Sequence, residues 1–83
     1  MLRIVIGQRG WVWIGHLEAD GEQVKLTNAR CIRKWGTTKG LGELVDGPTA
    51  KTVLDLAGTI RLHALAIVAT LDASEDGWKT ALA

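Results

Sequence analysis

The sequence predicts a mainly β (α+β) fold: a small antiparallel meander or partly open barrel, with a short helix after the fourth strand and a C-terminal helix. Runs of branched apolar residues separated by glycine-containing turns are typical of short strands. Asp20-Gly21 is a strong hairpin signal between two such runs. Apolar residues take helical spacing at residues 41–45 and again after residue 72. The chain has no linker, repeat or low-complexity tract, so residues 1–83 are predicted to form a single small β-rich domain.

The first two strands are predicted at residues 2–6 and 11–19, joined by a turn at residues 7–10. In the second strand Val12 and Ile14 are out of phase with Leu17, as if one residue were inserted near position 15. A β-bulge there would place these three side chains in the core. Trp11 and Trp13 would then share the opposite face, whereas the alternative register would bury both tryptophans.

A returning strand is predicted at residues 22–27, with Val24 and Leu26 facing inward. Asn28 tolerates a left-handed backbone and is predicted to mark a change of direction. A fourth strand follows at residues 29–35 and completes an antiparallel meander. Residues 36–42, which read GTTKGLG, are predicted to be a loop that leads into the short helix.

The last third of the chain fits neither the strand period nor the helix period throughout. Two strands are predicted, one near residues 53–57 and one from residue 59 to about 71, divided by Gly58. A buried helix starting near Ala64 is the alternative. The C-terminal helix is predicted to begin at Asp72 or Ser74, with Trp78 on its apolar face.

The small size of the chain predicts self-association. A domain of 83 residues buries only roughly 60 to 65% of its unfolded surface. Cys31 is the only cysteine, so an intrachain disulfide is excluded and a homo-oligomer is expected. The near-neutral net charge of +1 argues against binding to long nucleic acid. The apolar runs are too short to cross a membrane or to act as a signal peptide, so a soluble, cytoplasmic protein is expected.

The candidate ligand site centres on the loop at residues 36–42. The chain has no acidic residue between Glu22 and Glu43 but carries several lysines and arginines there. A glycine loop before a helix N-terminus attracts anions, which predicts a phosphate-bearing ligand. An ordinary connection with Thr38 as the helix N-cap is the alternative. The loop does not match GxxxxGK[ST], so Walker-type nucleotide hydrolysis is not inferred.

Tryptophan is the only aromatic residue type in the chain, which has four, and each indole can stack on a base or pack in a core or subunit contact. Arginines can bind phosphate bidentately. We therefore predict that the ligand is bound by nine residues: Arg9, Trp11, Trp13, Arg30, Arg33, Trp35, Thr37, Thr38 and Lys39. His16 and His63 have no partner at a diagnostic spacing, and Cys31 has no base beside it in the sequence. No catalytic residue, metal site or cofactor is predicted.

The run VWIGHLEADGEQVKLTNARCIRKW, followed by GLGELVDG, resembles a family of small, largely uncharacterised phage-encoded domains. The family pattern is a strand ending G-x-L, a D-G hairpin, V-x-L-x-N-A-R-x-I, a tryptophan segment and L-x-E-L. It falls on Gly15, Leu17, Asp20, Gly21, Val24, Leu26, Asn28, Ala29, Arg30, Ile32, Trp35, Leu41, Glu43 and Leu44. Here Arg33 and Lys34 stand where the family has aromatic residues, and the resemblance covers the first half of the chain.

Small phage proteins of this kind include sponges that sequester nucleotide immune signals, such as those of the Sequestin or Lockin type. The resemblance implies a phage anti-defence protein that binds an ADP-ribose-derived or cyclic-dinucleotide signal without cleaving it. The expected partners are therefore this small nucleotide and further copies of the chain. A structural oligomer that inhibits a host protein is the first alternative. A nucleotide hydrolase using His16 or His63 is the second.

Overall fold

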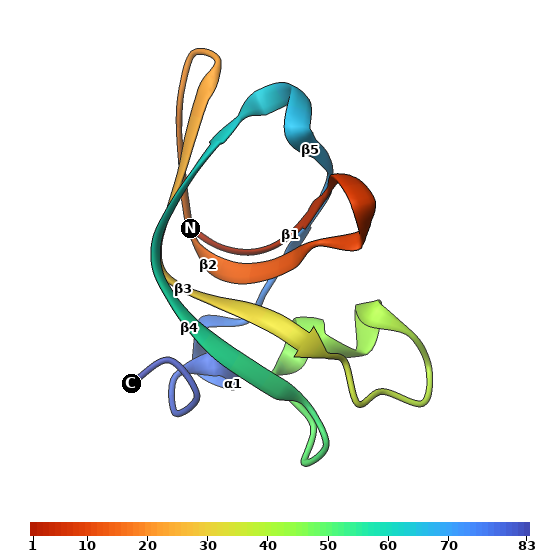
Figure 1. The fold of residues 1–83 in the computed structure, drawn as a ribbon. Helices are drawn as coiled ribbons and strands as arrows, with labels where there is room; N and C mark the ends of the chain where they lie inside the picture. Colours follow the sequence, from red (N-terminus) through yellow and green to blue (C-terminus); the bar gives the residue numbers. More distant parts are fainter.

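The computed structural model describes all residues, 1–83, and confirms the mainly β prediction. Five strands form one open antiparallel sheet in the order β4-β3-β2-β1-β5 (Figure 1). The strands are β1 (Leu2–Gly7), β2 (Val12–Asp20), β3 (Gln23–Lys34), β4 (Val53–His63) and β5 (Ile67–Asp72). The first four strands form a meander, and β5 returns to pair with the free side of β1. The sheet therefore curls, as Figure 1 shows, but does not close.

A register shift between β2 and β3 is present, but the extra residue lies on β3 and not near residue 15 of the second strand, as predicted. Ile14 pairs with Arg30 and His16 with Thr27, so β3 uses three residues where β2 uses two. Asn28, with φ of 50°, lies at this bulge. Asn28 therefore has the left-handed backbone that the sequence predicted, yet it bends one continuous strand instead of separating two. The predictions of a direction change at Asn28 and of a separate strand starting at residue 29 were wrong.

The sheet has a core on each side. The helix-side core contains Leu2, Ile4, Val12, Ile14, Ile32, Leu44, Trp78 and Leu82. The inner core, inside the curl, contains Val5, Leu26 and Ala29, with Trp13, Leu17, Ile60, Leu62 and Ile67 against them. Because β2 itself keeps its alternation, Leu17 belongs to the inner core and not, as predicted, to the core of Val12 and Ile14. Trp11 is exposed, so the register that would bury both tryptophans is not adopted.

The first helix has the predicted extent but is of the 3₁₀ type, and the C-terminal helix is shorter than predicted. The helix after β3 is a 3₁₀ helix, η2 (Leu41–Asp46), whose N-cap position is Gly40 without a side-chain cap, so Thr38 is not the N-cap. A three-residue 3₁₀ turn, η3 (Ala64–Ala66), divides β4 from β5. The predicted division at Gly58 and the alternative helix from Ala64 were wrong, since β4 continues through Gly58 with φ of 70°. No helix is long and apolar enough to cross a bilayer.

The C-terminal segment packs on the sheet of its own chain. Helix α1 (Glu75–Trp78) begins after Ser74, whose Oγ accepts a hydrogen bond from the Gly77 N–H at 3.1 Å. Trp78 is fully buried, and its indole Nε1 donates to the Leu44 carbonyl at 2.8 Å. Gly77 lies directly against the Asp46 carbonyl, where an added Cβ would be only 2.0 Å from the oxygen. This contact joins α1 to the end of η2.

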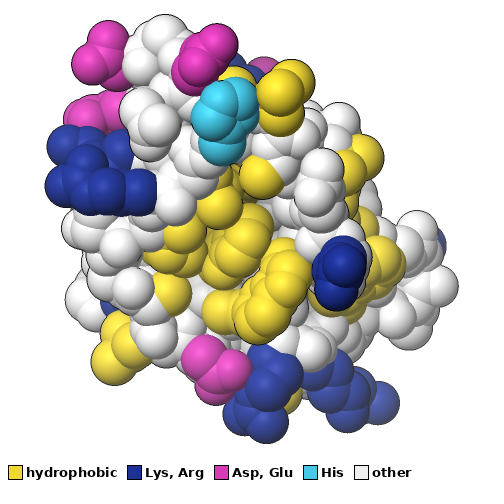
Figure 2. All heavy atoms as spheres, turned by 45° about the horizontal axis from the view of Figure 1, so that its top comes forward, with side chains coloured by type: hydrophobic (Ala, Val, Ile, Leu, Met, Phe, Trp, Pro, Cys, Tyr) yellow, Lys and Arg dark blue, Asp and Glu magenta, His cyan; other side chains and the backbone are white.

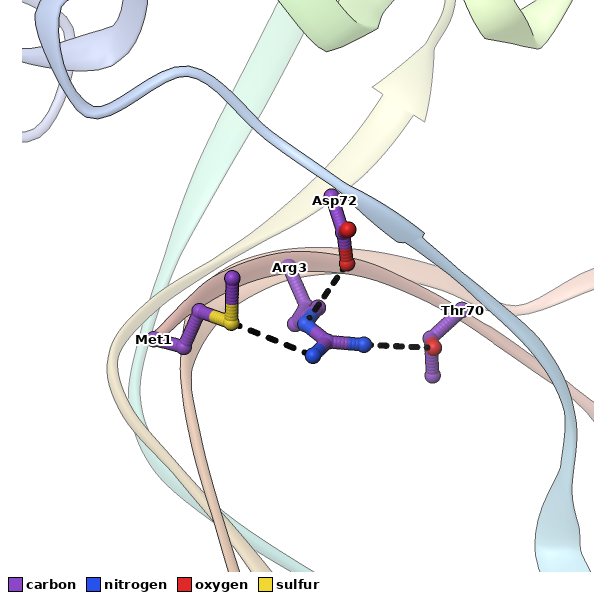
Figure 3. A network of polar contacts seen from close by, with 4 residues as sticks. All are labelled: Met1, Arg3, Thr70 and Asp72. Atoms are coloured by element: carbon purple, nitrogen blue, oxygen red, sulfur yellow. Dashed lines mark hydrogen bonds and ion pairs between the residues drawn. The ribbon is translucent and has the colours of Figure 1, made fainter.

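The edge strand β5 is held to β1 by a polar network around Arg3 (Figure 3). The Arg3 Nε lies 3.0 Å from the Asp72 Oδ1, in an ion pair that lacks the direction of a hydrogen bond. Its Nη1 donates to the Thr70 hydroxyl at 3.4 Å, and its Nη2 approaches the Met1 sulfur at 3.1 Å. The network adds side-chain contacts to the six-residue strand.

Candidate functional site

Trp11 and Trp13 form a stacked pair at the start of β2. Their ring centroids are 5.8 Å apart and their planes differ by 6°. Trp13 is half-buried, and its ring covers Gly7, where a Cβ would lie 2.8 Å from Cζ3. Trp11 is 56% exposed. The inner ring therefore holds the outer one in place, and an indole is presented to solvent without being buried in the core.

Basic and acidic groups share the sheet face of this pair. Trp13 is opposite Cys31 of β3, and Cys31 is opposite Asp55 of β4. Side chains directly opposite each other or two residues apart lie on one face, so Arg33 belongs to the same face. We call Trp11, Trp13, Cys31, Arg33 and Asp55 the aromatic face.

The Arg33 guanidinium is anchored but only partly used. Its Nε donates to the Asp55 Oδ2 at 2.9 Å, and its two Nη groups make no hydrogen bond within the chain. Arg9 lies two residues before Trp11 in the turn η1 (Gln8–Gly10), is exposed and makes no ion pair. In Figure 2 hydrophobic side chains gather in the middle of one face of the molecule, with Lys and Arg side chains at its margin.

The Cys31 thiol is a poor nucleophile in this setting. Burial raises the pKa of Cys31 above its ordinary value of 9.0, the Asp55 carboxylate raises it further, and Arg33 lowers it. The thiolate is the reactive form, so the thiol is protonated at neutral pH. The aromatic face also contains no histidine. Its residues can stack, donate hydrogen bonds and carry charge, which are binding functions.

Arg30 lies on the other face of the sheet. It alternates with Cys31 along β3 and is buried. Its Nη1 donates to the Asn28 Oδ1 at 3.0 Å, to the Asn28 carbonyl at 3.2 Å and to the Ala29 carbonyl at 3.3 Å. The guanidinium thus satisfies oxygens that the bulge turns away from the sheet ladder. The structure does not bring Arg30 together with Trp11 and Trp13.

The glycine loop, residues 36–42, is held by the Glu43 carboxylate of η2. The Thr38 N–H and hydroxyl both donate to Glu43, at 3.3 and 3.4 Å. Thr37 is half-buried, whereas Lys39 is exposed. Glu43 therefore occupies the donors that the sequence suggested for an anion. Trp35, two residues after Arg33, lies just beyond the end of β3 and is 41% exposed.

The base of this loop is fixed by two threonines that were not singled out in the sequence. Thr49 donates from its hydroxyl to the Gly36 carbonyl, and Thr52 to the Trp35 carbonyl, both at 2.7 Å. Gly36 has φ of 66°, and a Cβ there would lie 2.3 Å from the Lys51 carbonyl carbon. Of the nine predicted residues, the structure gathers Trp11, Trp13 and Arg33 on one face, with Arg9 in the adjoining turn and Trp35 beyond the end of β3.

Two cavities lie elsewhere, and neither contains any of the nine residues. The larger, about 330 Å³, is lined by Leu2, His16, Asn28, Glu75, Asp76, Trp78, Lys79 and Leu82. The smaller, about 250 Å³, is lined by Glu18, Ala19, Asp20, Gln23, Lys25 and Arg61. Sequence reasoning missed both, and the larger one joins residues from the two ends of the chain, Leu2 and Leu82. The smaller lies on the β2–β3 hairpin.

Each histidine has a carboxylate neighbour. His16 Nδ1 lies 3.7 Å from the Glu75 Oε1 in the larger cavity, and His63 Nε2 lies 3.5 Å from the Glu22 Oε2. The His63 Nδ1 accepts a hydrogen bond from the Leu65 N–H, so it caps η3. No group of three or more His, Cys, Asp or Glu side chains is arranged to hold a metal ion.

Comparison with known proteins gives no assignment: no family model matches the chain, and no curated protein matches it either.

Proposed function

We propose that this chain is a binding protein that captures a nucleotide-derived signal, an ADP-ribose derivative or a cyclic dinucleotide, without cleaving it. The observation that supports this most is the stacked Trp11–Trp13 pair, partly exposed on the sheet face that also carries Arg33. The resemblance to phage domains points to the setting, the cytoplasm of an infected bacterium, where the protein would remove an immune signal.

The chemistry of the aromatic face fits such a ligand in two parts. A base stacked on Trp11 would contribute about 1 to 3 kcal/mol. The two unused Nη groups of Arg33 can bind a phosphate, and Asp55 keeps the guanidinium oriented through Nε. Arg9 adds a second positive charge close to Trp11 in the sequence. Nanomolar capture corresponds to about 12 kcal/mol, so several such contacts must act together.

Self-association is part of the proposal. Only 15 of the 83 residues are buried, a small core for a chain that contains no disulfide. Two rings or two arginines from different copies would also strengthen capture by acting on a single ligand.

A ligand panel separates this proposal from its alternatives. Cyclic dinucleotides and ADP-ribose derivatives are added, and the melting temperature is recorded. A ligand at about 100 times its Kd stabilises the fold by roughly 2.7 kcal/mol, or roughly 10 to 20 °C for a domain of this size. The protein is then denatured and the released ligand identified. Intact ligand supports capture, a converted product supports a hydrolase, and the absence of any shift favours the protein-interaction alternative.

Variants test where the ligand binds. Trp11→Ala and Arg33→Ala are expected to reduce the melting shift, because they remove the exposed indole and the phosphate donor. Arg61→Ala is the matched control, since Arg61 is an exposed arginine on β4 outside the aromatic face. Trp35→Ala distinguishes the aromatic face from the loop. A full shift in Trp11→Ala together with a lost shift in Trp35→Ala would move the site to the loop.

A further inference from the structure

The two edges of the sheet are both free. β4 is hydrogen-bonded only to β3, and β5 only to β1. Each edge therefore presents backbone N–H and C=O groups that have no strand partner. Such edges accept another strand unless the sequence protects them with charges, proline or a covering element.

Over five residues each edge lacks charge and proline, although a register shift interrupts its pairing with the neighbouring strand, around Gly58 in β4 and at Val68 in β5. Residues 56–60 of β4 (LAGTI) and residues 67–71 of β5 (IVATL) contain no charged residue and no proline. The two stretches have equal length, and the charged residues Asp55, Arg61 and Asp72 lie only at their ends. Elsewhere the surface is well supplied with charge, so the uncharged edges stand apart from it.

Exposed apolar side chains gather along the same segments. Leu56 on β4 is 82% exposed, Leu65 in η3 is 80% exposed, and Val68 on β5 is 69% exposed. These three are half of the large hydrophobic residues that the structure leaves exposed. Exposed large apolar residues at interaction sites are commonly covered by a partner, so the segment from β4 through η3 to β5 is a candidate interface.

A second copy of this chain is the occupant that fits both edges. Every copy carries one β4 edge and one β5 edge, with uncharged stretches of the same length. The net charge of +1 gives little repulsion between copies, and the small core leaves the single chain in need of further buried surface. A partner of another kind would have to supply an uncharged strand that this chain already contains.

We propose that β4 of one copy pairs with β5 of the next and extends the sheet from chain to chain. This contact joins two different surfaces, so it builds a ring if the rotation closes and a filament if it does not. Trp11 lies just before β2 and Trp13 on it, and Trp13 packs in the inner core with Ile60 and Leu62 of β4 and Ile67 of β5. The pairing rests on the self-association included in the proposed function, but it uses backbone groups of the edges whereas capture uses indole and guanidinium side chains. The edge variants therefore test the pairing, and Trp11→Ala tests capture.

Two edge variants test this pairing, Leu56→Lys and Val68→Lys, each of which adds a charge at an exposed position of one edge. Ala50→Lys is the control, because Ala50 is an exposed apolar residue in the loop before β4. Molar masses are measured by light scattering after size exclusion at several protein concentrations. We expect a multimer for the wild type and for Ala50→Lys, and a monomer for each edge variant. Circular dichroism establishes that each variant is folded.

Mixing the two edge variants gives the decisive result. Each retains the edge that the other lacks, so an equal mixture is expected to form a one-to-one dimer of twice the monomer mass. A monomeric wild type at all concentrations would overturn the proposal. So would a multimer that only one of the two variants dissociates, because that result indicates pairing between identical edges.

Discussion

Replacing Trp78 with phenylalanine tests how the C-terminal segment is held to the sheet. The Trp78 ring is fully buried in the helix-side core, and its Nε1 donates to the Leu44 carbonyl at 2.8 Å. Phenylalanine removes this donor, and the Leu44 carbonyl keeps only the hydrogen bond from the Gly47 N–H at 3.1 Å, so the loss of one hydrogen bond costs about 0.5 to 1.5 kcal/mol. The smaller ring also leaves a void, adding roughly 1 kcal/mol. The free energy of unfolding is therefore expected to fall by about 1.5 to 2.5 kcal/mol.

The loss is large for a domain of this size. Unfolding free energies of native proteins are about 5 to 15 kcal/mol, and small domains lie near the lower end. Each kcal/mol corresponds to about 4 to 8 °C, so the melting temperature of Trp78→Phe is expected to drop by roughly 6 to 20 °C. Thermal and urea unfolding are followed by far-UV circular dichroism. Wild type and variant are compared at one protein concentration, because self-association also shifts the melting temperature.

Trp11→Phe is the matched control. It is the same substitution at an indole that is 56% exposed and donates no hydrogen bond within the chain. Its unfolding free energy is expected to change by less than about 0.5 kcal/mol. Equal losses of unfolding free energy in the two variants would mean that the buried Trp78 ring and its hydrogen bond do not hold the C-terminal segment to the sheet. A drop in melting temperature of less than about 3 °C for Trp78→Phe would mean the same.

Three further predictions follow from single contacts. Gly7→Ala places a Cβ 2.8 Å from the Trp13 Cζ3, so the ring must move. We expect the unfolding free energy from urea titration to fall by about 1 to 3 kcal/mol and the tryptophan emission spectrum to change. An unchanged spectrum would contradict this contact. Arg30→Met keeps the length of the side chain but removes the guanidinium that donates to the Asn28 and Ala29 oxygens at the bulge. We expect the unfolding free energy to fall by about 1 to 3 kcal/mol. An unchanged free energy would mean that water replaces the guanidinium. The pKa of Cys31 is raised in the fold, so the stability contributed by the protonated thiol is complete below the unfolded pKa near 9.0 and is lost as the pH rises through the higher folded value. Alkylation of Cys31 at pH 8 is therefore expected to be slower than alkylation of a cysteine in an unstructured peptide. Equal rates would contradict the raised pKa.

Local signals predicted much of the fold. The hairpin at Asp20-Gly21 joins β2 to β3, Ser74 caps the last helix, and Asn28 has the left-handed backbone expected of it. The prediction that Asn28 separates two strands was wrong. A residue with a left-handed backbone can end a strand or form a β-bulge within it. Which of the two occurs depends on whether the neighbouring strands continue to pair on both sides of that residue. Those pairings are made with β2 and β4, which no local pattern in β3 encodes.

The two-sided core explains why the pattern of residues 53–71 was ambiguous. Ile60 and Leu62 lie on the inner core, whereas Leu54 packs on the helix-side core, so apolar residues on β4 do not keep to one face. The strand period assumes one buried face and one exposed face. This sheet does not meet that assumption, because α1 and η2 cover one side and the curl buries residues on the other.

The candidate site was predictable only in part. Strand period placed Trp11 with Trp13 and gave Arg33 the same parity as Cys31, and the register joins these two sets into the aromatic face. The role of Arg30 at the bulge was not predictable, because it depends on the position of Asn28 oxygens. The contact of Glu43 with Thr38 was likewise hidden, since a carboxylate five residues on can face solvent or fold back over the loop.

Whether the Trp11 indole receives the ligand is measured by calorimetric titration of the ligand that gives the largest melting shift into the wild type and into Trp11→Ala. We expect intact ligand bound by the wild type and a Kd about 5- to 150-fold higher in the variant, the equivalent of one stacked base at about 1 to 3 kcal/mol. Equal dissociation constants for the two proteins would contradict the claim that the exposed indole of the stacked pair receives the ligand.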